Sequence, residues 1–223
     1  GSTSGATTCS VIPEETAGPY PGDGSNTANG SIADALALSG IVRSDIRASV
    51  AGASGTATGV PLTITIDLVD TGASCADLSG YAIYLWHCDA QGRYSMYSSG
   101  VTAENYLRGV QVTGSDGTVT FTTIVPGCYD GRVPHMHFEV YRSANSASSY
   151  SNKLHTSQIA FPADVMATVY ASAGGYGNSA ANFAGSSFAS DNVFSDGTSL
   201  QMATMSGSVS AGYIAALTVG IAA

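Results

Sequence analysis

The sequence predicts an all-β protein: a β-sandwich with long functional loops and at most one or two short helices. Three observations predict this class. Val, Ile, Thr and Tyr recur in short runs, Gly, Ser, Asn and Asp separate those runs, and only one stretch is typical of a helix. A chain of 223 residues with no internal repeat and no linker suits one large β domain. We therefore predict a single domain over residues 1–223.

The first predicted elements follow the chain in order. Residues 1–37 contain several prolines and many small polar residues, which predicts a largely irregular N-terminal segment. Residues 62–69 alternate apolar and polar side chains, the pattern of a half-buried strand. Residues 81–86 are almost wholly apolar and predict a central strand. Residues 109–112 and 118–124 flank the sequence Ser-Asp-Gly, which predicts a hairpin between them.

The second half of the sequence contains fewer predicted strands. Residues 137–141 form another strand candidate, and residues 163–171 are the best helix candidate because Pro162 precedes them. Residues 172–200 are rich in Gly, Ser and Asn and predict a long excursion. Residues 208–221 close the chain as one or two strands.

Composition excludes two function classes. The formal charge is −9, with only seven Lys or Arg and no basic run, so we expect no nucleic-acid partner. The longest apolar stretch, Ala211 to Ala223, has 13 residues, whereas a membrane-spanning helix needs about 20. We expect no membrane span.

The four cysteines, Cys9, Cys75, Cys88 and Cys128, contain no CxxC pair, which argues against a zinc ribbon or a thioredoxin-type site. Their even number, together with the low-lysine, Ser/Thr/Gly/Ala-rich composition, predicts an exported, oxidised protein. Four cysteines allow three disulfide connectivities.

Two histidines and two tyrosines form a candidate ligand set. His135 and His137 are two apart, so on a strand their imidazoles share one face, while Met136 and Phe138 face the other. Tyr129 precedes them within the run PGCYDGRVPHMHF, and Tyr94 follows a turn-like stretch. Phenolate is a hard, strongly donating oxygen that suits ferric iron better than zinc. Taken singly, each of these residues also fits an ordinary structural role.

The surrounding motifs resemble the intradiol ring-cleavage dioxygenases. They are PEETAGPY at 13–20, LWHCDAQGRYS at 85–95, GTVTFTTIVPGCY at 117–129, GRVPHMHF at 131–138 and KLHTSQI at 153–159. The likeness spans roughly residues 13–160. It is nearest to the compact, secreted branch of the family, because the helical dimerisation region of the intracellular enzymes is absent.

The resemblance implies a non-haem Fe(III) centre and an enzyme that cleaves a catechol with O2 to a muconate-type diacid. It identifies Tyr94, Tyr129, His135 and His137 as iron ligands. Tyr129 would leave the metal and act as an internal base, and Arg132 would stabilise developing negative charge. The family pattern also places Gln158 near the iron, with Tyr20 and Tyr106 as pocket-wall candidates. His87 and His155 match no ligand position.

The implied ligand set also suggests a disulfide arrangement. Cys88 and Cys128 lie shortly before Tyr94 and directly before Tyr129, so they would be close together if both tyrosines meet at iron. A free thiolate there could compete for Fe(III) or reduce it. We therefore predict the pair Cys88–Cys128 and, by elimination, Cys9–Cys75.

Two other readings remain open at this point. The chain could be a transthyretin-like or carbohydrate-binding sandwich with a vestigial metal site, or another metalloenzyme such as a copper or zinc hydrolase. The ring substituents of the catechol and the oligomeric state cannot be read from the sequence.

Overall fold

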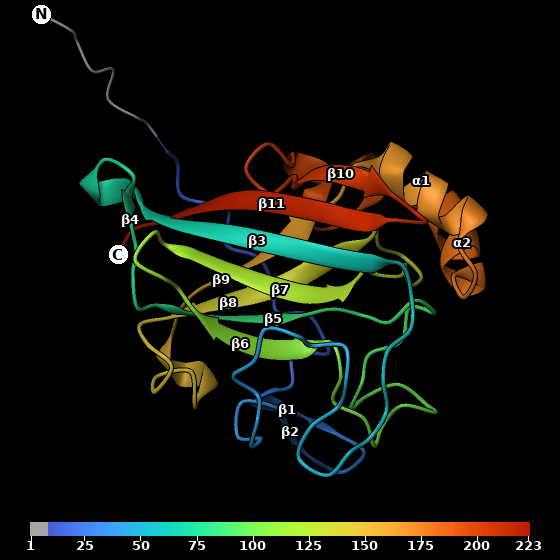
Figure 1. Ribbon diagram of the computed structural model, residues 1–223, viewed down its shortest axis with the longest axis horizontal. Coiled ribbons are helices and arrows are strands. Elements are labelled where there is room, and N and C mark those ends of the chain that lie inside the picture. The colour runs from blue at the N-terminus through green and yellow to red at the C-terminus, as the bar shows by residue number, and fades with distance from the viewer. Residues whose placement is uncertain (1–8) are drawn as a thin grey trace, which may run out of the picture.

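The computed structural model describes residues 9–223, which fold into a β-sandwich of two main sheets (Figure 1). The all-β prediction is confirmed. The first sheet has the order β10 (Thr204–Ser208), β11 (Gly212–Ile221), β3 (Pro61–Asp70) and β4 (Ala76–Asp77), and β7 (Thr118–Ile124) also pairs with β3. The second sheet has the order β6 (Arg108–Val112), β5 (Ala82–Trp86), β8 (His135–Tyr141) and β9 (Lys153–Ala160).

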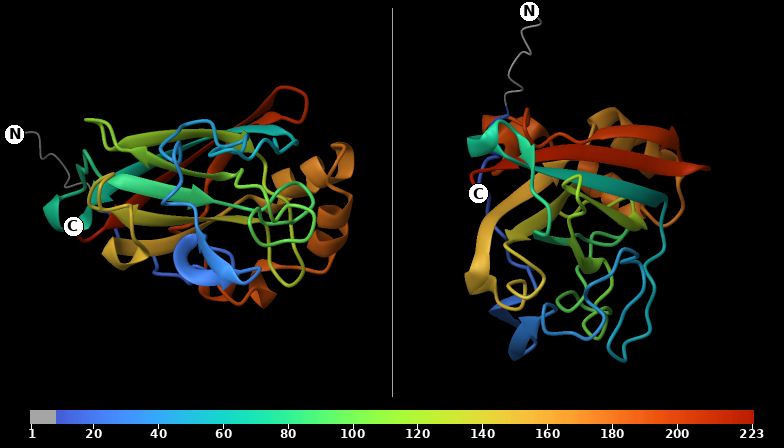
Figure 2. Two further views of the ribbon diagram at one scale, coloured as in Figure 1. Left: turned by 90° about the horizontal axis from the view of Figure 1, so that it is seen from below. Right: turned by 60° about the vertical axis from the view of Figure 1, so that its left-hand side comes forward.

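The apolar core lies between these two sheets, whose arrangement two further views of the ribbon show (Figure 2). Strand β3 alternates as predicted, with Ile64 and Ile66 fully buried between partly exposed threonine and aspartate side chains. From the second sheet, Met136 and Phe138 of β8 belong to the same apolar cluster. Full burial of each such side chain contributes about 1.5–3 kcal/mol. These contacts hold β8 in position. They therefore also set the position of the side chains on the opposite face of β8.

The N-terminal segment is less irregular than predicted. Strands β1 (Asp23–Ala28) and β2 (Ser31–Asp34) form an antiparallel hairpin within residues 1–37. Its turn is Asn29-Gly30, with φ of 51° and 81°, which is a dipeptide typical of two-residue hairpin turns. That dipeptide was the sequence signal for the hairpin. The part of this prediction that concerns residues 1–8 lies outside the described residues.

The predicted hairpin between residues 109–112 and 118–124 is wrong. Strand β6 pairs with β5 in the second sheet, whereas β7 pairs with β3 in the first. The Ser-Asp-Gly turn therefore leads from one sheet to the other. Residues 41–46 join the two strands instead: the amide of Arg43 donates to the carbonyl of Val110, and the amide of Ile46 donates to the carbonyl of Thr122.

Helix α1 (Ala163–Ser172) confirms the predicted helix, and Pro162 is its N-cap residue. A second helix, α2 (Gly177–Ala184), lies beside it at one end of the sandwich (Figures 1 and 2). Four short 3₁₀ helices also form: η1 (Thr71–Ala73), η2 (Tyr150–Asn152), η3 (Phe188–Ser190) and η4 (Phe194–Asp196). The excursion 172–200 thus contains α2, η3 and η4. Within residues 9–223 no helix is long and apolar enough to cross a membrane.

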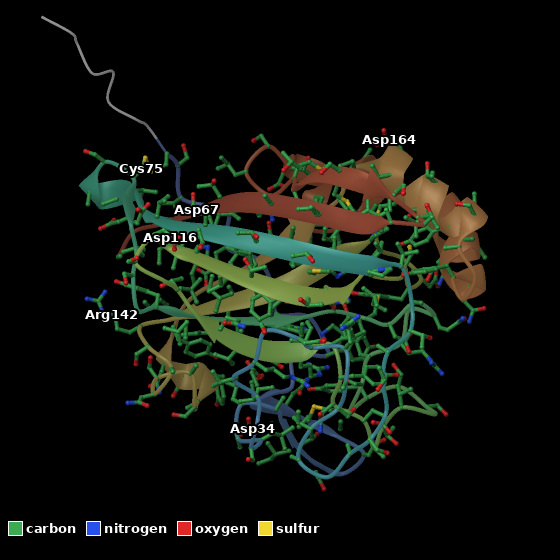
Figure 3. All side chains as sticks on the ribbon, viewed as in Figure 1. Asp34, Asp67, Cys75, Asp116, Arg142 and Asp164 are labelled. Carbon is green, nitrogen blue, oxygen red and sulfur yellow. A yellow bond between two sulfur atoms is a disulfide. The ribbon has the colours of Figure 1, made fainter. Side chains whose placement is uncertain are left out.

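One of the two predicted disulfides is present. Cys9 and Cys75 are bonded, and Cys75 lies just before β4 at the edge of the molecule (Figure 3). Cys88 and Cys128 are both free and buried, so the predicted bridge between them is wrong. Their side chains belong to different apolar clusters, and the Cys128 thiol donates to the Arg132 carbonyl at 3.2 Å. Proximity of the adjacent tyrosines is therefore not sufficient to form the bridge.

Candidate functional site

The four candidate ligands meet at one end of the second sheet. His135 and His137 lie on β8, Tyr94 lies in the turn after β5, and Tyr129 lies in the loop between β7 and β8. Opposite His137 on β5 is Trp86, whose ring stacks on the imidazole with centroids 5.0 Å apart and planes 5° apart. The strand pairing of β5 with β8 therefore fixes the orientation of the His137 ring.

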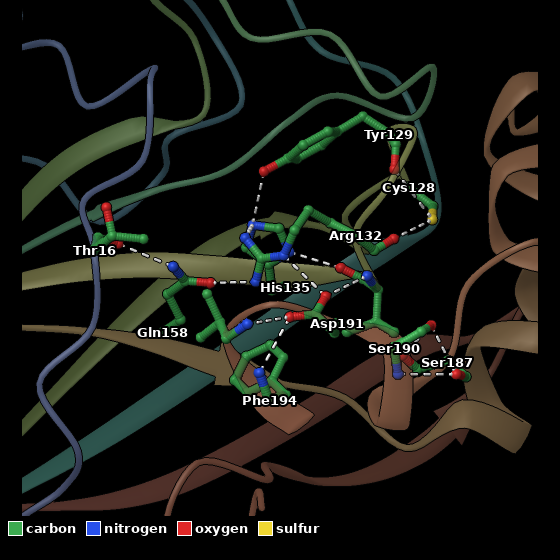
Figure 4. A network of polar contacts seen from close by, with 12 residues as sticks. Thr16, Cys128, Tyr129, Arg132, His135, Gln158, Ser187, Ser190, Asp191 and Phe194 are labelled. Carbon is green, nitrogen blue, oxygen red and sulfur yellow. Dashed lines mark hydrogen bonds and ion pairs between the residues drawn. The ribbon is translucent and has the colours of Figure 1, made fainter. Parts of the chain in front are cut away.

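Three polar atoms of this set converge on one point. The Nε2 atoms of His135 and His137 are 3.0 Å apart. The Tyr129 phenol oxygen is 3.3 Å from His135 Nε2 (Figure 4). Among residues 9–223, no hydrogen-bond partner meets the buried Tyr94 hydroxyl, although its ring lies 5.6 Å from that of Tyr129. A buried hydroxyl without a partner is unusual in a folded protein. This arrangement fits a cation with two nitrogen and two oxygen ligands.

The tautomer of His135 suits a metal ligand. Its Nδ1 lies 2.6 Å from the Val133 carbonyl, which can only accept a hydrogen bond, so Nδ1 carries the proton. The lone pair of the neutral ring is then on Nε2, the atom that faces His137 and Tyr129. Hydrogen bonds of this kind orient metal-bound histidines and fix their tautomers.

Burial keeps these four groups uncharged when no cation is bound. It lowers the pKa of His135 to about 3, with the nearby Arg132 charge adding to the effect. It also lowers the pKa of His137 well below the ordinary value. Burial raises the pKa of Tyr129 to about 12, and it raises the pKa of Tyr94 well above the ordinary value. The imidazoles are therefore ready to bind a metal, while the phenols need a cation to ionise.

The two tyrosines differ in access. Tyr94 is 1% exposed, whereas Tyr129 is half-buried. Tyr20 covers both of them: its ring stacks on Tyr94 at a centroid distance of 4.8 Å and meets Tyr129 edge-on at 6.3 Å. Tyr20 therefore lies against both candidate tyrosine ligands. Next to it, Gly18 passes so close to His137 that a Cβ atom would lie 3.2 Å from the imidazole.

Arg132 and Gln158 lie together beside the histidines. Arg132 Nη2 donates to the Gln158 Oε1 at 2.7 Å, and Nη1 is 3.4 Å from His135 Nε2. Gln158 in turn donates to the Thr16 carbonyl at 2.9 Å, which ties the N-terminal segment to β9. Both residues are therefore where the sequence predicts them, next to the candidate ligands.

Tyr106, a predicted wall residue, and the two histidines that match no ligand position lie elsewhere. Tyr106 does not reach the four ligands: its hydroxyl donates to Asp89 at 3.1 Å in a separate cleft lined by Gln91 and Arg93, so its predicted place in the pocket wall is wrong. His87 is fully buried and bonds to the Cys88 carbonyl and the Thr123 hydroxyl. His155 lies 3.9 Å from Glu14. Neither histidine joins the site.

Sequence reasoning missed two residues of the site. Trp86 was interpreted only as the end of a strand, because its contact with His137 comes from the pairing of β5 with β8, which has no local sequence signal. Asp191 accepts from Arg132 Nε at 2.8 Å and is buried. It comes from the Gly/Ser/Asn-rich excursion, where no motif or periodicity marks it. Within residues 9–223, no three His, Cys, Asp or Glu side chains gather as a metal site, so a metal centre here requires the tyrosines.

The β-sandwich carries two imidazoles and two phenols at one end of a sheet, and a family model identifies the class of protein. The model described as "Dioxygenase" matches residues 43–173, more than half of the chain. The protein is thus a dioxygenase.

Solved structures narrow the family. An intradiol ring-cleavage dioxygenase from Tetranychus urticae is 26% identical, with a TM-score of 0.71, covering 96% of this chain and 95% of that one. The dioxygenase domain of a carbohydrate-binding fusion protein from Streptomyces sp. SirexAA-E shares the fold at 21% identity and a TM-score of 0.57, covering 95% and 98%. No curated protein sequence matches significantly. The chain belongs to the intradiol ring-cleavage dioxygenase family.

Proposed function

We propose that this protein is a non-haem Fe(III) enzyme that cleaves a catechol-type ring with O2 to a muconate-type diacid. One observation carries the proposal. Two imidazole nitrogens 3.0 Å apart and a phenol oxygen 3.3 Å away converge beside a second buried phenol that has no hydrogen-bond partner. In the proposal, Tyr94, Tyr129, His135 and His137 hold the ion.

The chemistry of this donor set fits ferric iron. Two phenolates and two neutral imidazoles supply hard, anionic oxygen together with nitrogen, which favours a trivalent ion over zinc. When bound, ferric iron would accept electron density from a catecholate and so make the ring reactive toward O2. The two phenols would ionise on binding, because a bound cation lowers the pKa of its ligands.

The difference in exposure between the tyrosines supports separate roles. Tyr94 is buried under Tyr20 and is the fixed ligand in this proposal. Tyr129 is half-buried and is the one with room to move. Because burial raises the pKa of Tyr129 to about 12, a Tyr129 phenolate that is free of the ion would be a strong base and would accept a proton from a catechol hydroxyl.

Arg132 supplies the second proposed role. Its guanidinium lies beside His135, is 8% exposed and is fixed by hydrogen bonds on two edges. A fixed donor in a buried site stabilises negative charge that develops during reaction. Tyr20 forms an aromatic wall against which a planar ring can pack.

The colour of the protein tests the metal centre. Ferric tyrosinate gives a broad visible charge-transfer absorption, so the iron-loaded protein should be coloured and should consume O2 with catechol. Y129F should shift that band and depress turnover, while Y106F, which alters the separate cleft, should leave both unchanged. A protein that stays colourless after iron loading would instead favour a binding module or another metal.

We also propose that the protein is exported. The Cys9–Cys75 disulfide supports this, because disulfides persist in oxidising compartments. Fractionation of expressing cells into culture medium and cell contents tests it, and protein retained in the reducing cytosol would contradict it.

A further inference from the structure

Asp191 joins the C-terminal excursion to the candidate active site. Its Oδ2 accepts from Arg132 Nε at 2.8 Å and from the Val133 amide at 2.9 Å. Its Oδ1 accepts from the amides of Val193 and Phe194 at 2.9 and 3.1 Å. Its side chain is fully buried, and four hydrogen bonds satisfy both oxygens. A carboxylate with this many hydrogen bonds is held in a single position.

This position fixes the orientation of Arg132. Asp191 binds the Nε edge, Gln158 binds Nη2, and the ring of Phe194 lies 5.7 Å from the guanidinium carbon (Figure 4). Only Nη1 remains directed at His135, at 3.4 Å. A guanidinium is a rigid planar group. Hydrogen bonds on two of its edges therefore set the direction of the N–H groups on the third edge. Asp191 therefore determines which N–H groups of Arg132 face the ligands.

Asp191 also cancels the charge of Arg132. The Arg132 guanidinium lowers the pKa of the Asp191 carboxyl, which therefore stays ionised at neutral pH. A further acid, Glu15, reaches the same network, because Gln201 bonds to both Glu15 and the Gln158 carbonyl. The charged groups around Arg132 are thus mainly negative.

No other cation is free to balance a charged substrate. The chain has seven Lys or Arg residues, all within the described residues. Arg108 lies close to the backbone of Tyr20. Its N–H groups donate hydrogen bonds to Ser95, Tyr84 and the carbonyls of residues 20–21. The other five have partners away from the site: Arg43 with backbone carbonyls, Arg47 with Asp45, Arg93 with Asp89, Arg142 with Tyr81 and Lys153 with Glu139. A carboxylate on the substrate ring would therefore find no cationic side chain beside the candidate ligands with N–H groups left to bind it.

We propose that Asp191 is a positioning residue for Arg132 and that, by neutralising it, Asp191 gives the site a preference for catechols with uncharged ring substituents. The inference rests on the proposed function, since it concerns the substrate of that site. It assigns a role to a residue outside the ligand motifs.

The test compares D191N with a matched control, D196N. Both remove one carboxylate from the same excursion, but Asp196 is exposed and, within residues 9–223, makes no hydrogen bond or ion pair with Arg132. Iron-loaded protein is titrated without O2 with catechol and with 3,4-dihydroxybenzoate, and quenching of Trp86 fluorescence reports binding. Trp86 is the single tryptophan and stacks on His137. Turnover of both compounds is then measured with O2.

We expect D191N to strengthen binding of the carboxylated ring relative to catechol by about tenfold, because it unmasks one buried guanidinium charge. The kcat for catechol should fall by about 10- to 100-fold, because Arg132 loses its orientation. The control D196N should change neither quantity more than about twofold. D191E keeps the charge and should retain the wild-type binding ratio.

Two outcomes separate the hypotheses. If D191N weakens both ligands in parallel and leaves their ratio unchanged, Asp191 only supports the loop and the inference is overturned. If the wild-type protein binds both ligands but opens neither ring, the proposed function fails, while the binding ratio still decides the role of Asp191.

Discussion

Replacing Gly92 with alanine should disturb the contact between the two tyrosine-bearing loops. Gly92 has a φ of +80° and lies two residues before Tyr94. A Cβ atom there would lie 2.8 Å from the Cys128 carbonyl oxygen and 3.3 Å from the Tyr129 Cα. Both are backbone atoms, so the neighbour cannot rotate away. The loop that carries Tyr129 must shift as a whole.

The magnitude follows from two contributions. Placing alanine in the left-handed region costs about 1–2 kcal/mol. Forcing an extra carbon into a packed contact adds about 1–3 kcal/mol. We therefore expect G92A to lower the free energy of unfolding by about 2–5 kcal/mol. The iron-loaded protein should also show a shifted charge-transfer band, because Tyr129 moves.

The chain offers matched controls for the backbone contribution. Gly131 has the same φ of +80°, Gly80 has a φ of +79°, and a Cβ atom at either meets nothing within 4 Å. Urea unfolding of G92A, G131A and G80A, followed by Trp86 fluorescence, separates the two contributions. If G92A is destabilised no more than both controls, within about 0.5 kcal/mol, the close approach of the two loops is not a real constraint.

Three further predictions concern acid stability, the free thiols and the disulfide. Burial lowers the pKa of His87 from 6.5 to about 4, so its neutral form is favoured in the folded state. The contribution of neutral His87 to the free energy of unfolding is fully present above pH 6.5 and is lost as the pH drops toward 4. At about 1.4 kcal/mol per pH unit this loss reaches about 3 kcal/mol. H87Q should therefore reduce the pH dependence of the free energy of unfolding between pH 6.5 and pH 4. An unchanged slope would contradict this account of His87. Unfolded without reductant, the chain should expose two reactive thiols, from Cys88 and Cys128, whereas a count of zero would restore the bridge we predicted from the sequence. Reduction of Cys9–Cys75, which are 66 residues apart, should lower stability by about 4 kcal/mol in thermal or urea unfolding, and an unchanged midpoint would refute a stabilising role.

The sequence predicted those parts of the site that depend on local geometry or on ordered motifs. The spacing of His135 and His137 on a strand sets both rings on one face, and the structure agrees. Tyr94 and Tyr129 were predicted as ligands from the family motifs. No local sequence pattern predicts that their two separate loops lie close together. The predicted Cys88–Cys128 bridge failed for a related reason: adjacency to converging residues does not fix the direction of a neighbouring side chain.

The remaining differences depend on tertiary contacts. Tyr106 and Tyr20 were equally plausible as wall residues, yet only Tyr20 meets Tyr94 and Tyr129. Asp191 has no signal in a segment of low complexity, because its role comes from Arg132, which lies 59 residues earlier. The failed hairpin at residues 114–117 shows the same limit: a turn can be predicted locally, while the choice of partner strand cannot.

The parallel pairing of β11 with β3 has a consequence for the order of folding. Strand β11 inserts between β10 and β3, and it pairs with residues synthesised about 150 positions earlier, as the contact of Thr71 with Ile221 shows. Pairings of such sequence separation form slowly. Until residues 212–221 have emerged, one edge of β3 is an open template for other chains. Nascent or truncated chains should therefore aggregate through β3, and assistance by a chaperone would matter most just before the last strand is complete.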